Sequence, residues 1–317
     1  MTVQRLQSFC ASLDVIGREI LFVGYLFIKL TLGVVDSKFR VKSAFEGKDM
    51  KKWVILIFAV LLVCIGAYGR YEIYHPGKLS QDVIVVIPKG AGSRGVAEAL
   101  KQNGVIGNAL LFRIAARIYQ LDKELKAGEY MFPAHVSMYD VMQKIRKGDI
   151  VYHRFTIPEG LTSAQIARLI NAIPNLVGED VWDIPEGSML PETYTYKLGD
   201  TKAEVVSNAQ KAQSRVLAKA WKNRDSIIPV DSPEELLILA SIIEKETSVP
   251  EERRVVASVF VNRLEKGMRL QTDPTVIYAL TQGQGDLGRP LYRKDLKLDS
   301  PYNTYQNHGL PPTPICN

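Results

Sequence analysis

The sequence contains little cysteine and histidine, which excludes several kinds of site. Its 317 residues include three cysteines, Cys10, Cys64 and Cys316, which lie far apart without a CxxC spacing. This pattern excludes a disulfide framework and a cysteine-rich zinc site. The four histidines are also scattered, so no metal centre is expected. The formal charge of +6, from 40 Lys and Arg against 34 Asp and Glu, fits an anionic partner but is too small to indicate nucleic acid.

Apolar residues make up 46% of the chain and charged residues 23%, which is enough for one or two packed domains. The longest uncharged run, residues 53–69, would span roughly 26 Å as a helix, close to the thickness of a bilayer core. Six basic residues lie in positions 38–52 and two in positions 70–84. By the positive-inside rule, this predicts one transmembrane helix with a cytoplasmic N-terminus and an exported C-terminal part. A cleaved signal peptide is the alternative, because Gly66, Ala67 and Gly69 are small.

Residues 1–52 are expected to form a cytoplasmic segment. The apolar run at residues 20–28 is too short to span a bilayer. Two interpretations stay open: the run lies along the membrane surface as an amphipathic helix, or the natural chain starts at Met50 and residues 1–49 are not part of the protein.

After a short polar stalk at residues 70–82, the pattern predicts an α+β module over residues 83–175. A strand at 83–87 and a helix at 93–103, with Ser93 as its N-cap, return as 155–158 and 163–170 at an offset of 70 residues. Between them we expect a helix at 109–119, a strand at 128–132 and a helix at 138–147. The module is either a small carbohydrate-binding module of the LysM-like type or a plain spacer.

Residues 176–317 are expected to form a mainly helical domain, with helices at 201–221 and 232–248. In the second helix, Ser232 and Glu235 predict a capping box. Leu236, Leu239 and Ile243 form a core-facing stripe that Glu246 prolongs, whereas Glu244 falls nearer the polar side.

A carboxyl group on such a stripe would be desolvated, which raises its pKa and suits a general acid for glycosidic cleavage. Alternatively, Glu246 turns into water near the helix end or pairs with Arg253 or Arg254.

Several motifs resemble those of the endolytic murein transglycosylases, the MltG or YceG-like family of bacterial inner-membrane enzymes. They are, in order, PETY at 191–194, ASIIEKET at 240–247, VASVFVNRL at 256–264, GMRLQTDPTVIYAL at 267–280, SPYNTY at 300–305 and GLPPTPI at 309–315. The resemblance implies a single-pass transmembrane protein with a LysM-like α+β module and a mainly helical catalytic α+β domain. It also implies that Glu246 is catalytic and that the enzyme is a lyase without cofactor or metal.

The implied reaction cuts nascent peptidoglycan strands between N-acetylmuramic acid and N-acetylglucosamine and leaves 1,6-anhydro ends, which terminates strand elongation. Peptidoglycan synthases are possible protein partners. The motif residues with hydroxyls, amides and aromatic faces are assigned to substrate binding, although each could serve only in a turn or in packing: Gln271, Thr272, Asp273, Tyr278, Tyr302, Asn303, Thr304 and Tyr305. Asp273-Pro274 could instead open a helix, and Asn262-Arg263 could fix a helix to a loop.

The family pattern normally continues beyond GLPPxPI, so the catalytic domain is expected to be truncated after Asn317. Two rival functions stay open at this stage. One is a membrane scaffold that binds glycan without cutting it, and the other is a hydrolytic muramidase with Asp273 as a second carboxylate.

Overall fold

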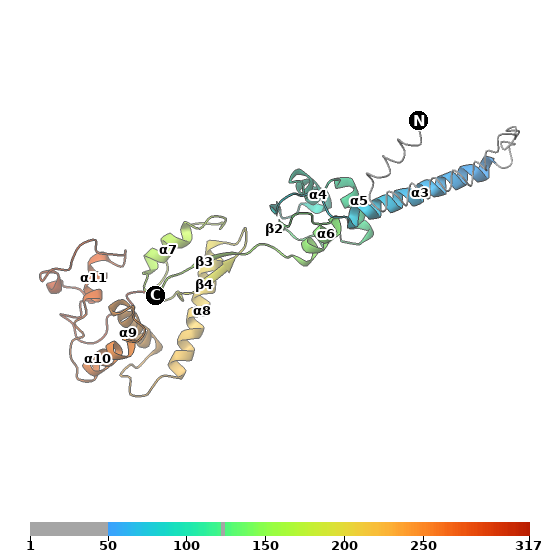
Figure 1. Ribbon diagram of the computed structural model, residues 1–317. Helices are drawn as coiled ribbons and strands as arrows, with labels where there is room; N and C mark the ends of the chain where they lie inside the picture. Colours follow the sequence, from blue (N-terminus) through green and yellow to red (C-terminus); the bar gives the residue numbers. More distant parts are fainter. Residues whose placement is uncertain (1–49, 122–123) are drawn as a thin grey trace. The chain divides into compact units, whose positions relative to one another are not determined.

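The computed structural model describes residues 50–121 and 124–317, and Figure 1 shows the order of the elements. The expectations for residues 1–49, including the apolar run at 20–28, lie outside the described residues. The contacts divide the chain into two compact units. The second unit consists of residues 86–89, 126–131 and 148–317, and the first contains the remaining described residues before Gly148.

The apolar run forms part of helix α3 (Met50–Tyr74). Within the described residues, α3 is the one helix long and apolar enough to cross a membrane, over Val54–Tyr74. Residues 70–74, which were expected to begin the stalk, continue the helix. Helix α3 contacts two other helices of the first unit, α5 (Ala109–Ile118) and α6 (Met138–Lys147).

The remaining elements of this region are β1 (Val83–Ile87), α4 (Gly92–Gln102) and β2 (Gly128–Phe132), and the two strands pair in a two-stranded sheet. The predicted bounds of β1, β2 and α6 are confirmed. The predicted N-cap of α4 is wrong, because the helix starts before Ser93, at Gly92 after Ala91, and no side chain caps it.

The predicted repeat is confirmed by β3 (His153–Thr156) and α7 (Ser163–Asn171), which repeat the β1–α4 arrangement. The strand lies two residues earlier than expected. Thr162 and Gln165 form a capping box that fixes the start of α7. The helix buries its apolar stripe at the positions equivalent to those buried in α4, namely Ile166, Ala167 and Ile170 after Val96, Ala97 and Leu100.

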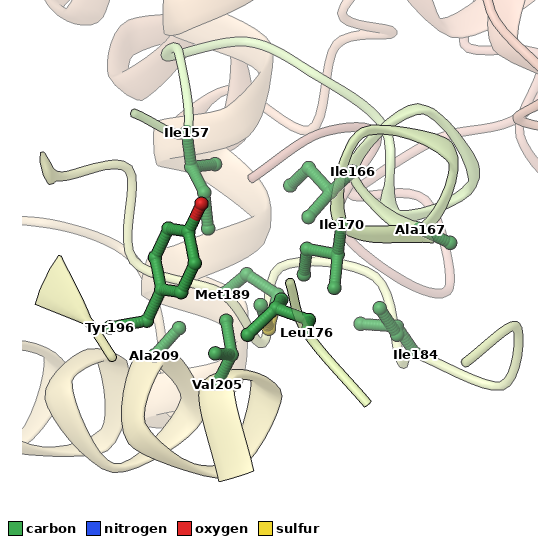
Figure 2. Close-up of a cluster of buried hydrophobic side chains, with 10 residues drawn as sticks. All are labelled: Ile157, Ile166, Ala167, Ile170, Leu176, Ile184, Met189, Tyr196, Val205 and Ala209. Atoms are coloured by element: carbon green, nitrogen blue, oxygen red, sulfur yellow. The ribbon is translucent and has the colours of Figure 1, made fainter. Parts of the chain in front are cut away.

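Strand β4 (Thr193–Tyr196) pairs antiparallel with β3, and α8 (Lys202–Lys222) follows behind a second capping box, formed by Thr201 and Glu204. Figure 2 shows the core that these elements share, in which α7 and α8 bury apolar side chains against Met189 and Tyr196. Burial of this apolar surface is the main force that holds the elements together. The result is the mixed helix and sheet architecture expected from the sequence.

The last part of the chain is mainly helical, as predicted, with α9 (Pro233–Glu246), α10 (Arg253–Glu265), α11 (Asp273–Thr281) and the 3-10 turn η1 (Asp295–Lys297). A second core joins α9 and α10 to the last residues of the chain through Ile242, Phe260 and Ile315. Ser241 strengthens this junction, because its hydroxyl accepts a hydrogen bond from the Ile315 backbone N–H at 3.0 Å.

Candidate active site

Glu246 is the last residue of α9. Pro233 occupies the first turn, and the Ser232 hydroxyl accepts a hydrogen bond from the Glu235 N–H. Only this half of the predicted capping box forms, since the Glu235 carboxylate accepts from the Asp231 N–H instead. At the other end, Thr247 is extended and buried. The helix therefore stops at Glu246, and no further turn follows to cover its side chain.

Of the two arrangements that the sequence left open for Glu246, burial is wrong, and exposure near the helix end is confirmed. Leu239 is buried and Ile243 is half-buried, but Glu246 at the end of their stripe is exposed, whereas Glu244 is half-buried. Helical periodicity gives the direction of a side chain but not what lies opposite it. The structure therefore provides no low-dielectric pocket around the free Glu246 carboxyl group.

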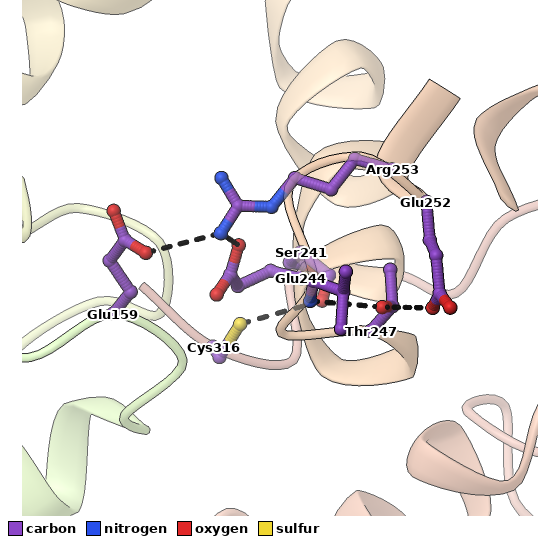
Figure 3. Close-up of polar contacts among 8 residues, drawn as sticks. Glu159, Ser241, Glu244, Thr247, Glu252, Arg253 and Cys316 are labelled. Carbon is purple, nitrogen blue, oxygen red and sulfur yellow. Dashed lines mark hydrogen bonds and ion pairs between the residues drawn. The ribbon is translucent and has the colours of Figure 1, made fainter. Parts of the chain in front are cut away.

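Arg253 does not pair with Glu246, although the sequence left that pairing open. Its guanidinium lies 3.2 Å from the Glu244 carboxylate and 3.3 Å from that of Glu159, as Figure 3 shows. Burial raises the pKa of Glu244, and Arg253 opposes this rise. Figure 3 also shows Thr247 donating to Glu252 at 2.9 Å, which secures the turn after α9. Glu246 is thus left out of the ion pairs at this end of the helix.

Glu246 is held instead by a threonine. The Thr272 hydroxyl donates to Glu246 Oε2 at 2.7 Å, and Thr272 itself is only 3% exposed. The Thr272 N–H donates to Thr304 Oγ1 at 3.1 Å, and the Thr275 hydroxyl donates to the Thr272 carbonyl at 2.7 Å. Thr275 and Thr304 also share a hydrogen bond of 2.9 Å. Because these partners fix the Thr272 backbone, its hydroxyl presents a hydrogen at a defined place.

Asp273 and Tyr305 lie next to this threonine cluster. The Tyr305 hydroxyl donates to Asp273 Oδ1 at 2.7 Å, and burial followed by Asp273 raises the pKa of Tyr305 to about 12. The negative charge of Glu246 contributes to the same rise, which places Glu246 in the electrostatic neighbourhood of Tyr305. Gln271 joins the group through its N–H, which donates to the Thr304 carbonyl at 3.2 Å.

The structure therefore gathers six of the nine candidate residues around Glu246, counting that residue itself. The remaining three, Tyr278, Tyr302 and Asn303, have other partners. Asn303 is fully buried and donates to the carbonyls of Leu296 and Leu298, which is the turn role that the sequence left open. The rings of Tyr278 and Tyr302 pack with their centroids 4.9 Å apart.

Two of the structural alternatives raised by the sequence are confirmed. Asp273-Pro274 does open a helix, α11, although the N-cap is Thr272. Arg263 does fix α10 to a loop, because its guanidinium donates to the Leu270 carbonyl at 2.5 Å. The loop that carries Gln271 and Thr272 is thus tied to α10 on one side and to Thr304 on the other.

A cavity of about 310 Å³ adjoins this group of residues. Lys245, the neighbour of Glu246, and Pro274, the neighbour of Asp273, both line it, together with Gln165, Tyr278 and Thr281. The volume lies at the lower end of the range typical of small-molecule sites. Polar groups and an aromatic ring thus line a concave space next to the sequence neighbours of Glu246 and Asp273, although none of the six residues gathered around Glu246 lines it.

The family model of the YceG-like family matches residues 85–317. The chain belongs to the YceG-like family. The YceG-like match covers all of the elements from α4 onward and both residues of the Glu246–Thr272 pair. The resemblance inferred from the motifs is therefore confirmed.

Two named relatives agree with this assignment, and one solved structure is also similar. The YceG-like chain is 33% identical over 282 residues to the endolytic murein transglycosylase of Bacillus subtilis (strain 168). The match covers 79% of this chain and 77% of that protein. It is 28% identical over 322 residues to the endolytic murein transglycosylase of Streptococcus pneumoniae serotype 2 (strain D39 / NCTC 7466), and the match spans 57% of that protein. A crystal structure of a YceG-like protein from Listeria monocytogenes is 34% identical, with a TM-score of 0.43, and covers 75% of this chain and 86% of that one.

The sequence did not single out Glu186, a carboxylate with an unusual environment. Glu186 Oε1 accepts from the Ser163 N–H at 2.7 Å and from Asn317 Nδ2 at 2.9 Å, and Oε2 accepts from the Tyr278 hydroxyl at 3.0 Å. Burial raises the pKa of Glu186, and the hydrogen bonds oppose the rise. The position of Glu186 shortly before PETY at 191–194 was the one hint in the sequence that this carboxylate matters, but the partners of Glu186 lie far away in the sequence.

Proposed function

We propose that this chain is an endolytic peptidoglycan lytic transglycosylase in which Glu246 acts as both acid and base. The observation that carries the proposal is the asymmetry of the carboxyl group. One oxygen of Glu246 accepts from the buried Thr272 hydroxyl at 2.7 Å. The other oxygen has no hydrogen bond to any residue in the ranges 50–121 and 124–317 and belongs to an exposed side chain.

This arrangement suits the proton transfers of a lytic reaction. In the acid form, Oε2 accepts from Thr272 and the proton sits on the free oxygen Oε1. Glu246 then protonates the O4 oxygen of N-acetylglucosamine as its bond to C1 of N-acetylmuramic acid breaks. The C6 hydroxyl of N-acetylmuramic acid attacks C1, and the carboxylate takes up its proton. A 1,6-anhydro ring forms, Glu246 is protonated again, and water is not consumed.

The bound glycan supplies the desolvation that the free site lacks. Glu246 is exposed in the structure, but a sugar chain over the end of α9 and the adjoining cavity would displace water from its carboxyl group. Desolvation favours the neutral acid.

We assign substrate contacts to the polar groups closest to Glu246, namely Gln271, Asp273 and Tyr305, and to Tyr278 at the wall of the 310 Å³ cavity. Thr272, Thr304 and Asn303 are buried, so they act by holding the loops in place. Tyr302 supports Tyr278 by ring packing. The polar and aromatic surface suits N-acetyl sugars, which offer hydroxyl and amide groups beside an apolar ring face.

In this proposal α3 anchors the chain in the bacterial inner membrane with its N-terminus in the cytoplasm, so that the catalytic domain acts on nascent strands outside. The repeated α+β region before residue 176 serves as a LysM-like glycan-binding module. Peptidoglycan synthases are the protein partners that this position favours, because they supply the strands to be cut.

The decisive experiment is digestion of purified peptidoglycan by the whole chain in detergent, with mass spectrometry of the fragments. We expect 1,6-anhydro ends from the parent protein and none from Glu246→Gln, which keeps the shape of the side chain. Glu251→Gln, at an exposed position shortly after α9, is the matched control and should cut normally. Reducing ends would instead support the hydrolase, and retention of glycan without new ends would support the scaffold.

A further inference from the structure

Helix α5 exposes an apolar stripe that its own unit leaves uncovered. Leu110, Ile114 and Ile118 follow at a spacing of four residues and are 61%, 48% and 71% exposed. The opposite face of α5 is buried through Phe112, Ala115 and Ala116. Residues four apart share one side of a helix, so the three exposed side chains form a continuous strip, which we call the α5 strip.

The α5 strip lies beside the point where the apolar part of α3 ends. Leu111 Cδ1 is 3.9 Å from the position that a Cβ on Gly69 would take, and Gly69 closes the uncharged run of α3. At the other end of α5, the hydroxyls of Tyr119 and Tyr74 are 2.8 Å apart. Tyr74 lies five positions after Gly69 in α3, which corresponds to about 7.5 Å along the helix axis.

That distance along α3 matches the thickness of one layer of lipid headgroups. Each headgroup region adds roughly 5 to 8 Å to the hydrocarbon core of a bilayer. Tyr68, which is 61% exposed on α3, marks the same level, because tyrosine collects at membrane interfaces. With the uncharged run of α3 in the bilayer, α5 is therefore level with the boundary between acyl chains and headgroups.

The charges around the α5 strip also favour a lipid surface. Arg113 and Arg117 are exposed and alternate with the apolar residues of the strip. Neither forms an ion pair with any residue in the described part of the chain. Arg70 of α3 lies over the Tyr74 ring, 4.9 Å from its centroid, and so adds a third positive charge near the same level. An apolar stripe flanked by arginines is typical of helices that lie in the interface of anionic membranes.

We propose that α5 lies in the outer surface of the membrane that α3 crosses, with the α5 strip among the acyl chains and the arginines at anionic phospholipid headgroups. This inference rests on the membrane anchoring in the proposed function. The contacts to Gly69 and Tyr74 hold α5 at a fixed height, and the Asn108 side chain fixes its first turn by accepting from the N–H groups of Leu110 and Leu111.

The test uses the whole chain, one copy per nanodisc of equal parts phosphatidylcholine and phosphatidylglycerol. Ile114→Cys carries an environment-sensitive fluorophore in a background with Cys10→Ser and Cys64→Ser. Cys316 stays, because it is buried and burial raises its pKa to about 12, so it does not react. The control carries the same label at Glu98→Cys on α4, also in nanodiscs. At position 114 we expect blue-shifted emission and strong quenching by spin-labelled lipid. Quenching by aqueous iodide should be several-fold weaker there than at position 98.

A second label, at Val60→Cys within α3, separates the two proposals. If position 60 is not quenched by spin-labelled lipid, the membrane anchoring itself is wrong. If position 60 is quenched and position 114 behaves like position 98, the inference about α5 is overturned. Shielding of position 114 from iodide without quenching by lipid would also overturn it, since a protein surface would then cover the α5 strip.

The arginines provide an independent readout. Arg113→Gln with Arg117→Gln should reduce the blue shift at position 114 in anionic discs and leave it unchanged in discs of phosphatidylcholine alone. An equal effect in both lipids would contradict the proposed contact with anionic headgroups. The readout here is the fluorescence of the label and not the cleavage of peptidoglycan. Failure of the proposed enzyme activity would therefore leave this result interpretable.

Discussion

Replacing Thr272 with valine removes the hydroxyl that holds the Glu246 carboxyl group and keeps the shape of the side chain. The backbone bonds of Thr272 to Thr304 and Thr275 do not involve this hydroxyl, so the fold should stay intact. The single lost interaction is the 2.7 Å bond to Glu246 Oε2. The perturbation therefore tests whether an oriented carboxyl group is needed for cleavage.

The expected loss follows from the type of hydrogen bond. Bonds to charged groups contribute about 1.5 to 3 kcal/mol. Because Glu246 is exposed, water replaces part of the lost bond, and the lower end applies. A loss of about 1.4 kcal/mol corresponds to a tenfold lower rate. We expect kcat/KM of Thr272→Val to fall about tenfold.

The assay measures the rate at which 1,6-anhydro ends appear from purified glycan strands. Thr193→Val is the matched control, because its exposed hydroxyl lies on β4 and, among residues 50–121 and 124–317, bonds only to Thr156. Thermal unfolding of both variants checks that they are folded. Parent-like cleavage by a fully folded Thr272→Val protein would refute the idea that this hydroxyl positions the acid.

Asp273→Asn should keep cleavage within about tenfold of the parent and keep the anhydro product, because the lytic route needs one carboxylate; a near-complete loss with Asn would favour the hydrolase. Gly187→Ala should destabilise the fold by about 2 to 4 kcal/mol in urea unfolding, because Gly187 has φ +73° and a Cβ there would lie 2.6 Å from Pro314; an unchanged midpoint would contradict this packing. The pKa of Glu186 is raised in the folded protein, so the unfolded chain loses this proton at a lower pH. Stability therefore falls as the pH rises from the ordinary pKa of glutamate through the pKa of Glu186 in the folded protein. Melting curves from about pH 4 to about pH 8 should show a flatter pH dependence for Glu186→Gln than for the parent, and identical curves would count against the buried carboxylate.

Local patterns predicted the elements of this protein well. The run of β-branched residues at 83–87 gave β1 its observed bounds, the expected bounds of α6 also match, and the repeat at an offset of 70 residues predicted β3, two residues out of place, and α7. Capping residues and periodicity reflect interactions within about one helical turn. The sequence could therefore also place Glu246 near the end of α9. The start of α4 was missed because Gly92 has φ +56°, a conformation that spacing does not indicate.

Properties that depend on distant segments could not be predicted. The exposure of Glu246 follows from the end of α9 and from the loop that presents Thr272, 26 residues further along the chain. Glu186 is half-buried and accepts hydrogen bonds from Ser163 and Tyr278, which lie 23 and 92 residues away. No local pattern reports such proximity, and so the sequence left open whether Glu246 is buried and left Glu186 unnoticed.

The end of α3 determines how the first unit responds to its membrane. Helix α3 continues without a break to Tyr74, whose ring stacks on that of Tyr139 at a centroid distance of 5.0 Å. No loop separates the membrane-crossing part of the helix from these packed rings. A helix longer than the local hydrocarbon thickness tilts to match it. If α3 crosses a bilayer as proposed, its increased tilt in a thinner bilayer would incline the part of the first unit packed on Tyr74 with it, so that lipid composition would set the angle between this unit and the membrane.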